Sequence, residues 1–121
     1  MGKAILIVDD SKAIRQSMSF VLEQAGYAVT QAEDGQDALG KLQAGTFQLI
    51  VTDVNMPNMD GIALTKAVRA DGPHKFTPIL ILTTESQEEK MKEGKTAGAT
   101  GWIVKPFESD KLVSVVGKLI N

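Results

Sequence analysis

The chain has 121 residues, of which 43% are hydrophobic, so we expect residues 1–121 to form one compact domain with no room for a second. With 13 basic and 15 acidic residues the net charge is -2 and no basic run occurs, which argues against a protein that binds nucleic acid. The chain has no cysteine, which excludes disulfide scaffolds, thiolate metal sites and cysteine nucleophiles.

The first predicted element is a strand at residues 4–9, an apolar run that is typical of a strand buried on both faces. This run is too short for a signal peptide or a membrane span, so we expect a cytoplasmic protein without membrane contact. A helix follows, which Ser11 can cap and Gly26 can end. Its apolar residues recur at helical spacing: Ile14, Met18, Val21, Leu22 and Ala25.

Strand and helix patterns then alternate to the end of the chain. A second helix begins at Asp34-Gly35 and a third at Asp60-Gly61, and both follow a turn signal. The further strand patterns lie at residues 28–32, which is the weakest, 48–53, 78–83 and 101–104, and the last helix carries Leu112, Val116, Leu119 and Ile120 on one face. Each crossover helix returns the chain to the same direction, which predicts a doubly wound α/β fold with a five-stranded parallel sheet.

One predicted helix, at residues 86–99, has few apolar residues. Ser86 and Glu89 form a capping box at its start, but Gly94 lies in its interior, where glycine costs about 1 kcal/mol relative to alanine. Met91 and Ala97 are its main apolar residues. The pattern indicates either a helix that is held weakly to the sheet, and can therefore move, or an ordinary solvated surface helix.

The only histidine, His74, lies in a turn-rich loop before the fourth strand. A single loop histidine is more often solvated than functional. We therefore expect an exposed side chain without a role.

Three aspartates lie at the carboxyl ends of two predicted strands, Asp9 and Asp10 at the end of the first and Asp53 at the end of the third. Because the carboxyl ends of parallel strands meet at one edge of a sheet, we expect the three carboxylates to converge. Two unit charges about 4 Å apart repel by roughly 4 kcal/mol at an effective dielectric near 20, so the cluster requires a cation. The donors are all oxygen atoms, which favours Mg²⁺.

Two further polar residues end predicted strands at the same edge, Thr83 on the fourth and Lys105 on the fifth. A lysine together with a bound metal ion attracts an anion, for which a phosphoryl group is the usual candidate. Asp53 stands alone on the central strand and is the candidate nucleophile, and Thr83 offers a hydroxyl to a phosphoryl oxygen. Each of these residues alone is typical of a helix cap, a surface charge or an ordinary strand. Together, five such residues at the ends of the correct strands predict a functional site: Asp9, Asp10, Asp53, Thr83 and Lys105.

The chain resembles the receiver domain of bacterial response regulators over its whole length, and within that family it looks closest to the single-domain chemotaxis regulators. The resemblance implies a flavodoxin-like fold with strand order 2-1-3-4-5. It rests, in order and spacing, on Ile7-Val8-Asp9-Asp10, on residues 53–61 (Asp-Val-Asn-Met-Pro-Asn-Met-Asp-Gly), on Thr83, and on residues 101–107 (Gly-Trp-Ile-Val-Lys-Pro-Phe).

This resemblance implies that Asp53 accepts a phosphoryl group from a histidine kinase. It also implies that Mg²⁺ is held by Asp9, Asp10, Asp53 and the backbone carbonyl of Asn55. Such a protein is a binding module that catalyses only its own Mg²⁺-dependent phosphorylation and dephosphorylation. Asn55 and Glu85 match the pair that flanks the attacking water in the chemotaxis regulators, which predicts a short-lived phosphoryl group.

The resemblance further implies that Lys105 contacts the phosphoryl oxygen and that its peptide bond to Pro106 is cis. On phosphorylation Thr83 would move to the phosphoryl group and Trp102 would turn into the space it leaves, which would change the face formed by residues 86–99 and the last strand. Trp102 stands where tyrosine is commoner, so the switch is expected to be incomplete or differently tuned. Thr84 stands where a smaller residue is frequent, which is expected to narrow the access of phosphoryl donors and water to the site.

The implied output is a flagellar motor switch protein, with a phosphatase as a further partner and the chain itself a monomer. The alternative within the family is a stand-alone receiver that relays or drains phosphoryl groups outside motility. A phosphohydrolase with an aspartyl-phosphate is disfavoured, because the place of its general acid is taken by Asn55. Flavin binding is disfavoured because Asp9 and Asp10 would repel the flavin phosphate.

Overall fold

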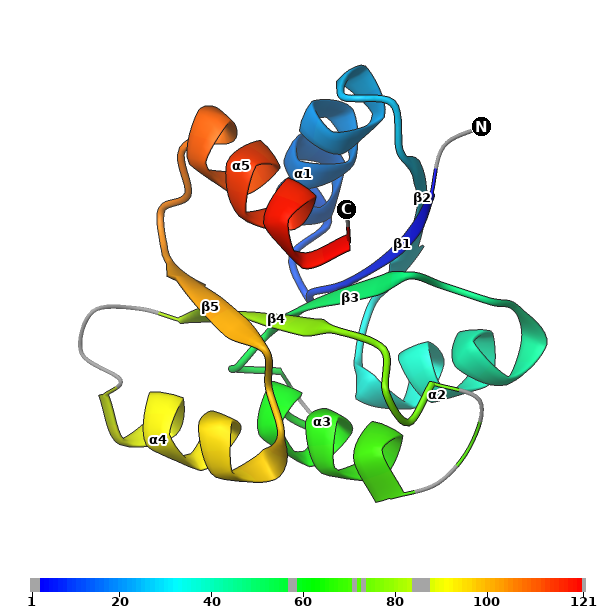
Figure 1. The fold of residues 1–121 in the computed structure, drawn as a ribbon, viewed down its shortest axis with the longest axis vertical. Helices are drawn as coiled ribbons and strands as arrows, with labels where there is room; N and C mark the ends of the chain where they lie inside the picture. The colour runs from blue at the N-terminus through cyan, green and yellow to red at the C-terminus, as the bar shows by residue number, and fades with distance from the viewer. Residues whose placement is uncertain (1–2, 57–58, 71, 73, 84–87, 121) are drawn as a thin grey trace.

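The structure is a computed structural model that describes residues 3–56, 59–70, 72, 74–83 and 88–120 (Figure 1). Within these residues the chain alternates between strands and helices, as predicted. The strands are β1 (Ala4–Val8), β2 (Ala28–Ala32), β3 (Leu49–Asp53), β4 (Ile79–Thr83) and β5 (Gly101–Val104). The helices are α1 (Lys12–Gln24), α2 (Gly35–Ala44), α3 (Gly61–Ala70), α4 (Glu88–Ala97) and α5 (Ser109–Ile120).

The described strands form a parallel five-stranded sheet in the order β2-β1-β3-β4-β5. The predicted fold class and strand order are therefore confirmed. Strand β1 ends at Val8, one residue before the predicted end, and β3 and β4 each begin one residue later than predicted. These differences are within the usual uncertainty of element ends.

Helices cover both faces of the sheet (Figure 1), with α1 and α5 on one face and α2, α3 and α4 on the other. Successive side chains of a strand point to opposite faces, so the apolar run of β1 contributes to both cores. Ile5 and Ile7 pack with α1 and α5, whereas Leu6 and Val8 pack with residues of α2 and α3. This double burial explains why the strands are continuous apolar runs without polar alternation.

Side-chain caps fix where three of the helices begin. The Ser11 Oγ atom accepts the Ile14 N–H at 3.3 Å, as predicted for α1. Asp34 accepts the Asp37 N–H at 2.8 Å at the start of α2, and Asp60 accepts the Ala63 N–H at 2.8 Å at the start of α3. Ser86 of the capping box predicted for the fourth helix lies outside the described residues.

Helix α4 packs on the sheet through its backbone. Gly94 is the buried residue of this helix, and a Cβ atom placed on it would lie 3.0 Å from Cδ1 of Ile81 on β4. The packing therefore explains why glycine lies in the interior of this helix, because the absence of a side chain lets the helix axis approach the sheet closely. The remaining residues of α4 are exposed or half-buried, as the sparse apolar pattern predicted.

The prediction for His74 is wrong. Its side chain is 4% exposed, and its Nε2 atom accepts the backbone N–H of Phe47 at 3.0 Å. The loop before β4 folds against the chain segment before β3, where a buried N–H needs an acceptor, and the imidazole supplies it. The described part of the chain contains no helix long and apolar enough to cross a membrane.

Candidate functional site

Two adjacent strands bring the three aspartates together at the carboxyl edge of the sheet. Asp53 is the last residue of β3, and Asp9 directly follows β1, which pairs with β3. Asp9 is 1% exposed and Asp53 is 6% exposed, whereas Asp10 is exposed. One carboxylate oxygen from each of the three residues lies within 4.8 Å of the others, so the predicted convergence is confirmed.

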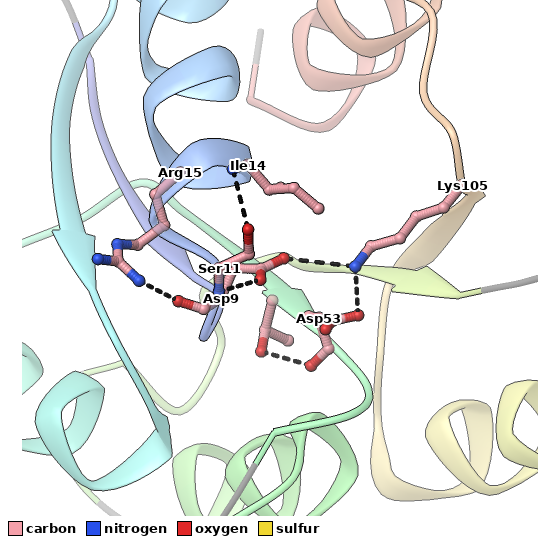
Figure 2. Close-up of polar contacts among 7 residues, drawn as sticks. Asp9, Ser11, Ile14, Arg15, Asp53 and Lys105 are labelled. Carbon is pink, nitrogen blue, oxygen red and sulfur yellow. Dashed lines mark hydrogen bonds and ion pairs between the residues drawn. The ribbon is translucent and has the colours of Figure 1, made fainter.

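Lys105 extends from the end of β5 into this group of carboxylates (Figure 2). Its Nζ atom lies 2.9 Å from Oδ1 of Asp53 and 3.4 Å from Oδ2 of Asp9. The Lys105 N–H donates to the Thr83 carbonyl at 2.6 Å, which fixes the backbone from which the side chain departs. The peptide bond between Lys105 and Pro106 is cis, as the resemblance implied.

Burial and neighbouring charges both shift the pKa values of Asp9 and Lys105. Burial raises the pKa of Asp9 and the charge of Asp53 adds to this, although the Ser11 N–H and Lys105 oppose the shift. Burial by itself lowers the pKa of Lys105, but the hydrogen bond and charge of Asp53 and the charge of Asp9 outweigh it and raise the pKa overall. Lys105 is therefore a cation at neutral pH.

The donor set of the site fits a hard divalent cation. The Lys105 ammonium group neutralises one of the three carboxylates. When all three carboxylates are ionised, the site therefore still carries excess negative charge. All the converging protein donors are carboxylate oxygens, with no histidine or cysteine among them. Mg²⁺ prefers such ligands and keeps several waters, so an arrangement with an exposed member, Asp10, suits it.

Ser11 and Arg15, to which the sequence reasoning gave no role in the site, hold Asp9 in place. The carboxylate of Asp9 accepts the Ser11 N–H at 2.8 Å, and its backbone carbonyl accepts from Nη1 of Arg15 at 2.6 Å (Figure 2). Arg15 also donates from Nε to Gln31 on β2 at 3.3 Å. The only sequence signal for Arg15 was its position one helical turn after the cap residue Ser11.

Gly61 was also missed as a residue of the site. A Cβ atom on Gly61 would collide with the backbone carbonyl oxygen of Asp53, so only glycine allows α3 to begin this close to β3. Its N–H donates to the Val54 carbonyl at 3.0 Å, and the Thr52 hydroxyl donates to the Asp53 carbonyl at 3.0 Å. The sequence reasoning interpreted Asp60-Gly61 as the start of a helix and as part of the motif at residues 53–61, but gave Gly61 no role in the site.

Thr83 and Trp102 lie on the neighbouring strands β4 and β5. Thr83 is 1% exposed, and its Oγ1 atom has no hydrogen-bond partner among the described residues. Trp102 is half-buried, pairs with Ile81, and packs against the core on the α3 side of the sheet. Asn55 is exposed in the loop after β3, whereas Glu85 and Thr84 lie outside the described residues.

Comparisons with known proteins agree on one family. Residues 5–117 match the model of the response regulator receiver domain. The chain is 41% identical to the chemotaxis protein CheY of Pseudomonas aeruginosa over 97% of this chain and 95% of that protein. It is 43% identical to the chemotaxis protein CheY-3 of Vibrio cholerae over 97% of this chain and 91% of that protein.

Solved structures give the same result. The chemotaxis protein CheY4 of Vibrio cholerae superimposes with a TM-score of 0.93 and is 50% identical, over 98% of this chain and 99% of that one. The receiver domain of a sensor histidine kinase from Pseudomonas aeruginosa, which has a magnesium ion coordinated in its active-site cleft, superimposes with a TM-score of 0.91 and is 27% identical, over 99% and 98% of the two chains. The chain belongs to the response regulator receiver family of two-component signalling.

Proposed function

We propose that residues 1–121 form one phosphorylation-activated receiver domain and that Asp53 is its phosphoacceptor. The observation that carries this proposal is the 2.9 Å contact between Asp53 and Lys105 inside a group of three carboxylates. A carboxylate oxygen with a cation beside it and a metal site around it can approach a phosphoryl group without prohibitive repulsion. The same cation then meets the oxygen atoms of the phosphoryl group.

In the proposed step, an Asp53 carboxylate oxygen attacks the phosphorus of a phosphohistidine on a histidine kinase. The new O–P bond forms as the P–N bond breaks, and the electron pair stays on the imidazole nitrogen of the kinase. Asp9, Asp10, Asp53 and the backbone carbonyl of Asn55 would hold Mg²⁺. When bound, this ion supplies charge neutralisation of the phosphoryl oxygens. Lys105 binds a phosphoryl oxygen, which replaces part of its contact with Asp53.

The switch residues we propose are Thr83 and Trp102. The unpartnered Thr83 hydroxyl gains a hydrogen bond if it moves to the phosphoryl group, and this supports its role. Trp102 then turns into the space that Thr83 leaves. The face that changes is formed by α4 and β5, and the small buried surface of α4 supports its displacement.

The signalling role that we propose is in chemotaxis. The 41% identity to a chemotaxis protein over 97% of this chain supports a phosphorylated form that binds a flagellar motor switch protein. A histidine kinase is the phosphoryl donor, a phosphatase is a further partner, and the chain acts as a cytoplasmic monomer. Its own chemistry is limited to its phosphorylation and dephosphorylation, in which Asn55 and Glu85 orient the attacking water.

Incubation with Mg²⁺ and acetyl phosphate tests the acceptor. We expect a mass gain of one phosphoryl group located at Asp53 by peptide mapping. Asp53→Asn should abolish the gain, and Asp110→Asn, which changes an exposed aspartate of α5, should leave it intact. Phosphorylation at another residue, or steady hydrolysis of an added phosphoester without a phosphoprotein, would contradict the proposal.

A binding assay tests the output separately. The phosphorylated protein and Asp53→Asn, both with Mg²⁺, are titrated with a purified flagellar motor switch protein. We expect binding that depends on phosphorylation. Normal phosphorylation without any such binding would instead favour a receiver that relays or drains phosphoryl groups.

A further inference from the structure

The last turn of α3 carries an arginine that contacts two distant parts of the chain. The Nε atom of Arg69 donates to the carbonyl of Gly98, the residue directly after α4, at 3.0 Å. Its Nη1 atom donates to the Thr77 carbonyl at 2.7 Å and to the Lys75 carbonyl at 3.1 Å, both in the segment before β4. Burial lowers the pKa of Arg69, but its guanidinium stays charged at neutral pH, so these hydrogen bonds are charge-assisted. Arg69 therefore joins α3, the end of α4 and the segment before β4.

The backbone at Gly98 favours glycine for two reasons. Gly98 has a φ of 109°, a conformation that residues with a Cβ atom rarely adopt. A Cβ atom on Gly98 would also lie 3.0 Å from Cγ and 3.1 Å from Nε of Arg69. The Gly98 N–H donates to the Gly94 and Lys95 carbonyls, both at 3.1 Å, which ends the helix. The end of α4 and the Arg69 side chain are therefore packed directly against each other.

The two ends of α4 are held differently. The helix runs from the carboxyl edge of the sheet, where β4 ends at Thr83, back to the amino edge, where β5 begins (Figure 1). At the amino edge the Thr100 N–H donates to the Ile79 carbonyl at 2.8 Å, and Oγ1 of Thr100 accepts the Ile79 N–H at 3.1 Å. Among the described residues, no hydrogen bond or ion pair connects residues 88–93 of α4 with another element. Within this part of the chain, polar contacts therefore anchor α4 only at the end far from the phosphorylation site.

We propose that Arg69 is a positioning residue that holds the C-terminal end of α4 in place, so that phosphorylation displaces this helix at its N-terminal end with Gly98 as the pivot. This role rests on the proposed function, in which Thr83 moves first and the face formed by α4 and β5 changes. Four residues separate Thr83 from Glu88, the first residue of α4, so the movement of Thr83 acts on the end without the anchor. A helix with one fixed end moves most at its other end, whereas a helix without the anchor can shift as a whole.

Amide hydrogen exchange tests where α4 moves. Each rate is measured with Mg²⁺ alone and with Mg²⁺ and excess acetyl phosphate, and the ratio of the two rates is compared between the two ends of the helix. In the unmodified protein we expect phosphorylation to speed exchange by about tenfold or more at Lys92 and Glu93, and by less than about twofold at Gly98 and Ala99. Equal ratios at the two ends, or a larger ratio at Gly98 and Ala99, would overturn the proposal.

Two pairs of variants isolate the contact between Arg69 and Gly98. Arg69→Met keeps a long apolar side chain but removes the guanidinium, and it should raise the exchange ratio at Gly98 and Ala99 to about tenfold. Lys66→Met removes an exposed cation from the same helix and should leave this ratio unchanged. Gly98→Ala should act like Arg69→Met, whereas Gly26→Ala, which has similar backbone strain at a φ of 101° but open space around it, should not. If Arg69 only stabilised the fold, its loss would speed exchange equally with and without acetyl phosphate, and this unchanged ratio would contradict the proposal.

The receiver function is measured separately in the same samples. Mass spectrometry shows whether Asp53 of each protein carries a phosphoryl group. Its absence from the unmodified protein would overturn the proposed function and the role of Arg69 with it. Phosphorylation with an unchanged ratio in a folded Arg69→Met variant would overturn the role of Arg69 alone. If the amide spectrum shows that Arg69→Met does not fold, Gly98→Ala and the comparison of the two helix ends in the unmodified protein decide the question.

Discussion

The Nζ atom of Lys105 lies 2.9 Å from Oδ1 of Asp53. The side chain proposed to receive the phosphoryl group is therefore ion-paired, and Lys105 is 19% exposed, so the pair is only partly screened by solvent. We expect Lys105→Met to slow phosphorylation by acetyl phosphate by about 10²-fold, because the developing charge on the phosphoryl oxygens loses a fixed cation. The rate of phosphoprotein formation at saturating Mg²⁺ measures this. Lys118→Met, which removes an exposed lysine from α5, is the control and should leave the rate unchanged.

Magnesium should stabilise the folded protein. A ligand that binds only the folded state adds about 2.7 kcal/mol to the unfolding free energy at a concentration 100 times its Kd. We expect Asp10→Asn to reduce this gain strongly while leaving the metal-free protein no less stable, because it removes one of three clustered carboxylates. Thermal unfolding with and without Mg²⁺ tests the expectation. A metal-free variant that is clearly less stable than the unmodified protein would show that the repulsion argument is wrong.

The Thr83 hydroxyl should destabilise the resting protein. It is buried without a partner, so the isosteric change Thr83→Val should raise the unfolding free energy by about 1 kcal/mol. The same change should weaken phosphorylation-dependent partner binding, because the proposed bond to the phosphoryl group is lost. Thr65→Val is the matched control, because the Thr65 hydroxyl donates to the Gly61 carbonyl at 2.8 Å, and its removal should lower the stability. Chemical denaturation of both variants gives the comparison, and equal losses would contradict it.

His74 should make stability depend on pH. Burial holds its pKa in the folded state below the ordinary value of 6.5, so the unfolded chain binds the proton more readily. The unfolding free energy should therefore be independent of this group above about pH 7 and fall as the pH drops below about 6.5, by at most about 1.4 kcal/mol per pH unit. Denaturation between about pH 7.5 and 5.5 measures the slope. His74→Gln, which does not titrate, should give a flatter slope, and an unchanged slope would exclude His74 as the cause.

Substitution by alanine should change the unfolding free energy in opposite directions at two glycines. Gly61→Ala places a methyl group against the Asp53 carbonyl and should destabilise the protein by about 2 kcal/mol or more, with slower phosphorylation because Asp53 shifts. Gly40 lies within α2 with open space around it, so Gly40→Ala should stabilise the protein by about 0.5–1 kcal/mol. The unfolding free energies of the two variants test the pair. A tolerated Gly61→Ala would mean that the start of α3 can move away from β3 at little cost.

The fold was predictable because its signals are local and repeated. The apolar run of β1 and the caps at Ser11, Asp34 and Asp60 each fix one element, and their alternation fixes the parallel sheet. The convergence of Asp9, Asp10 and Asp53 followed from the direction of the strands alone.

The missed features depend on contacts between distant segments. Gly61 is required by the Asp53 backbone, and Arg15 binds the Asp9 carbonyl and the Gln31 side chain, which no periodic pattern encodes. His74 is buried because Phe47, 27 residues away, needs an acceptor. Glycines at close contacts between elements, and single polar residues that bond to a distant segment, are therefore the positions at which sequence reasoning has least information.

The backbone packing of α4 separates two kinds of constraint on the sequence. Gly94 alone among the residues of this helix is buried, so its close approach to Ile81 requires only that this position stays small. The exposed side chains of α4, among them Glu88, Lys92 and Glu93, can change with little effect on the core. The surface of α4, which we propose as part of the output face, can therefore change its partner specificity while the atoms that maintain the fold stay the same.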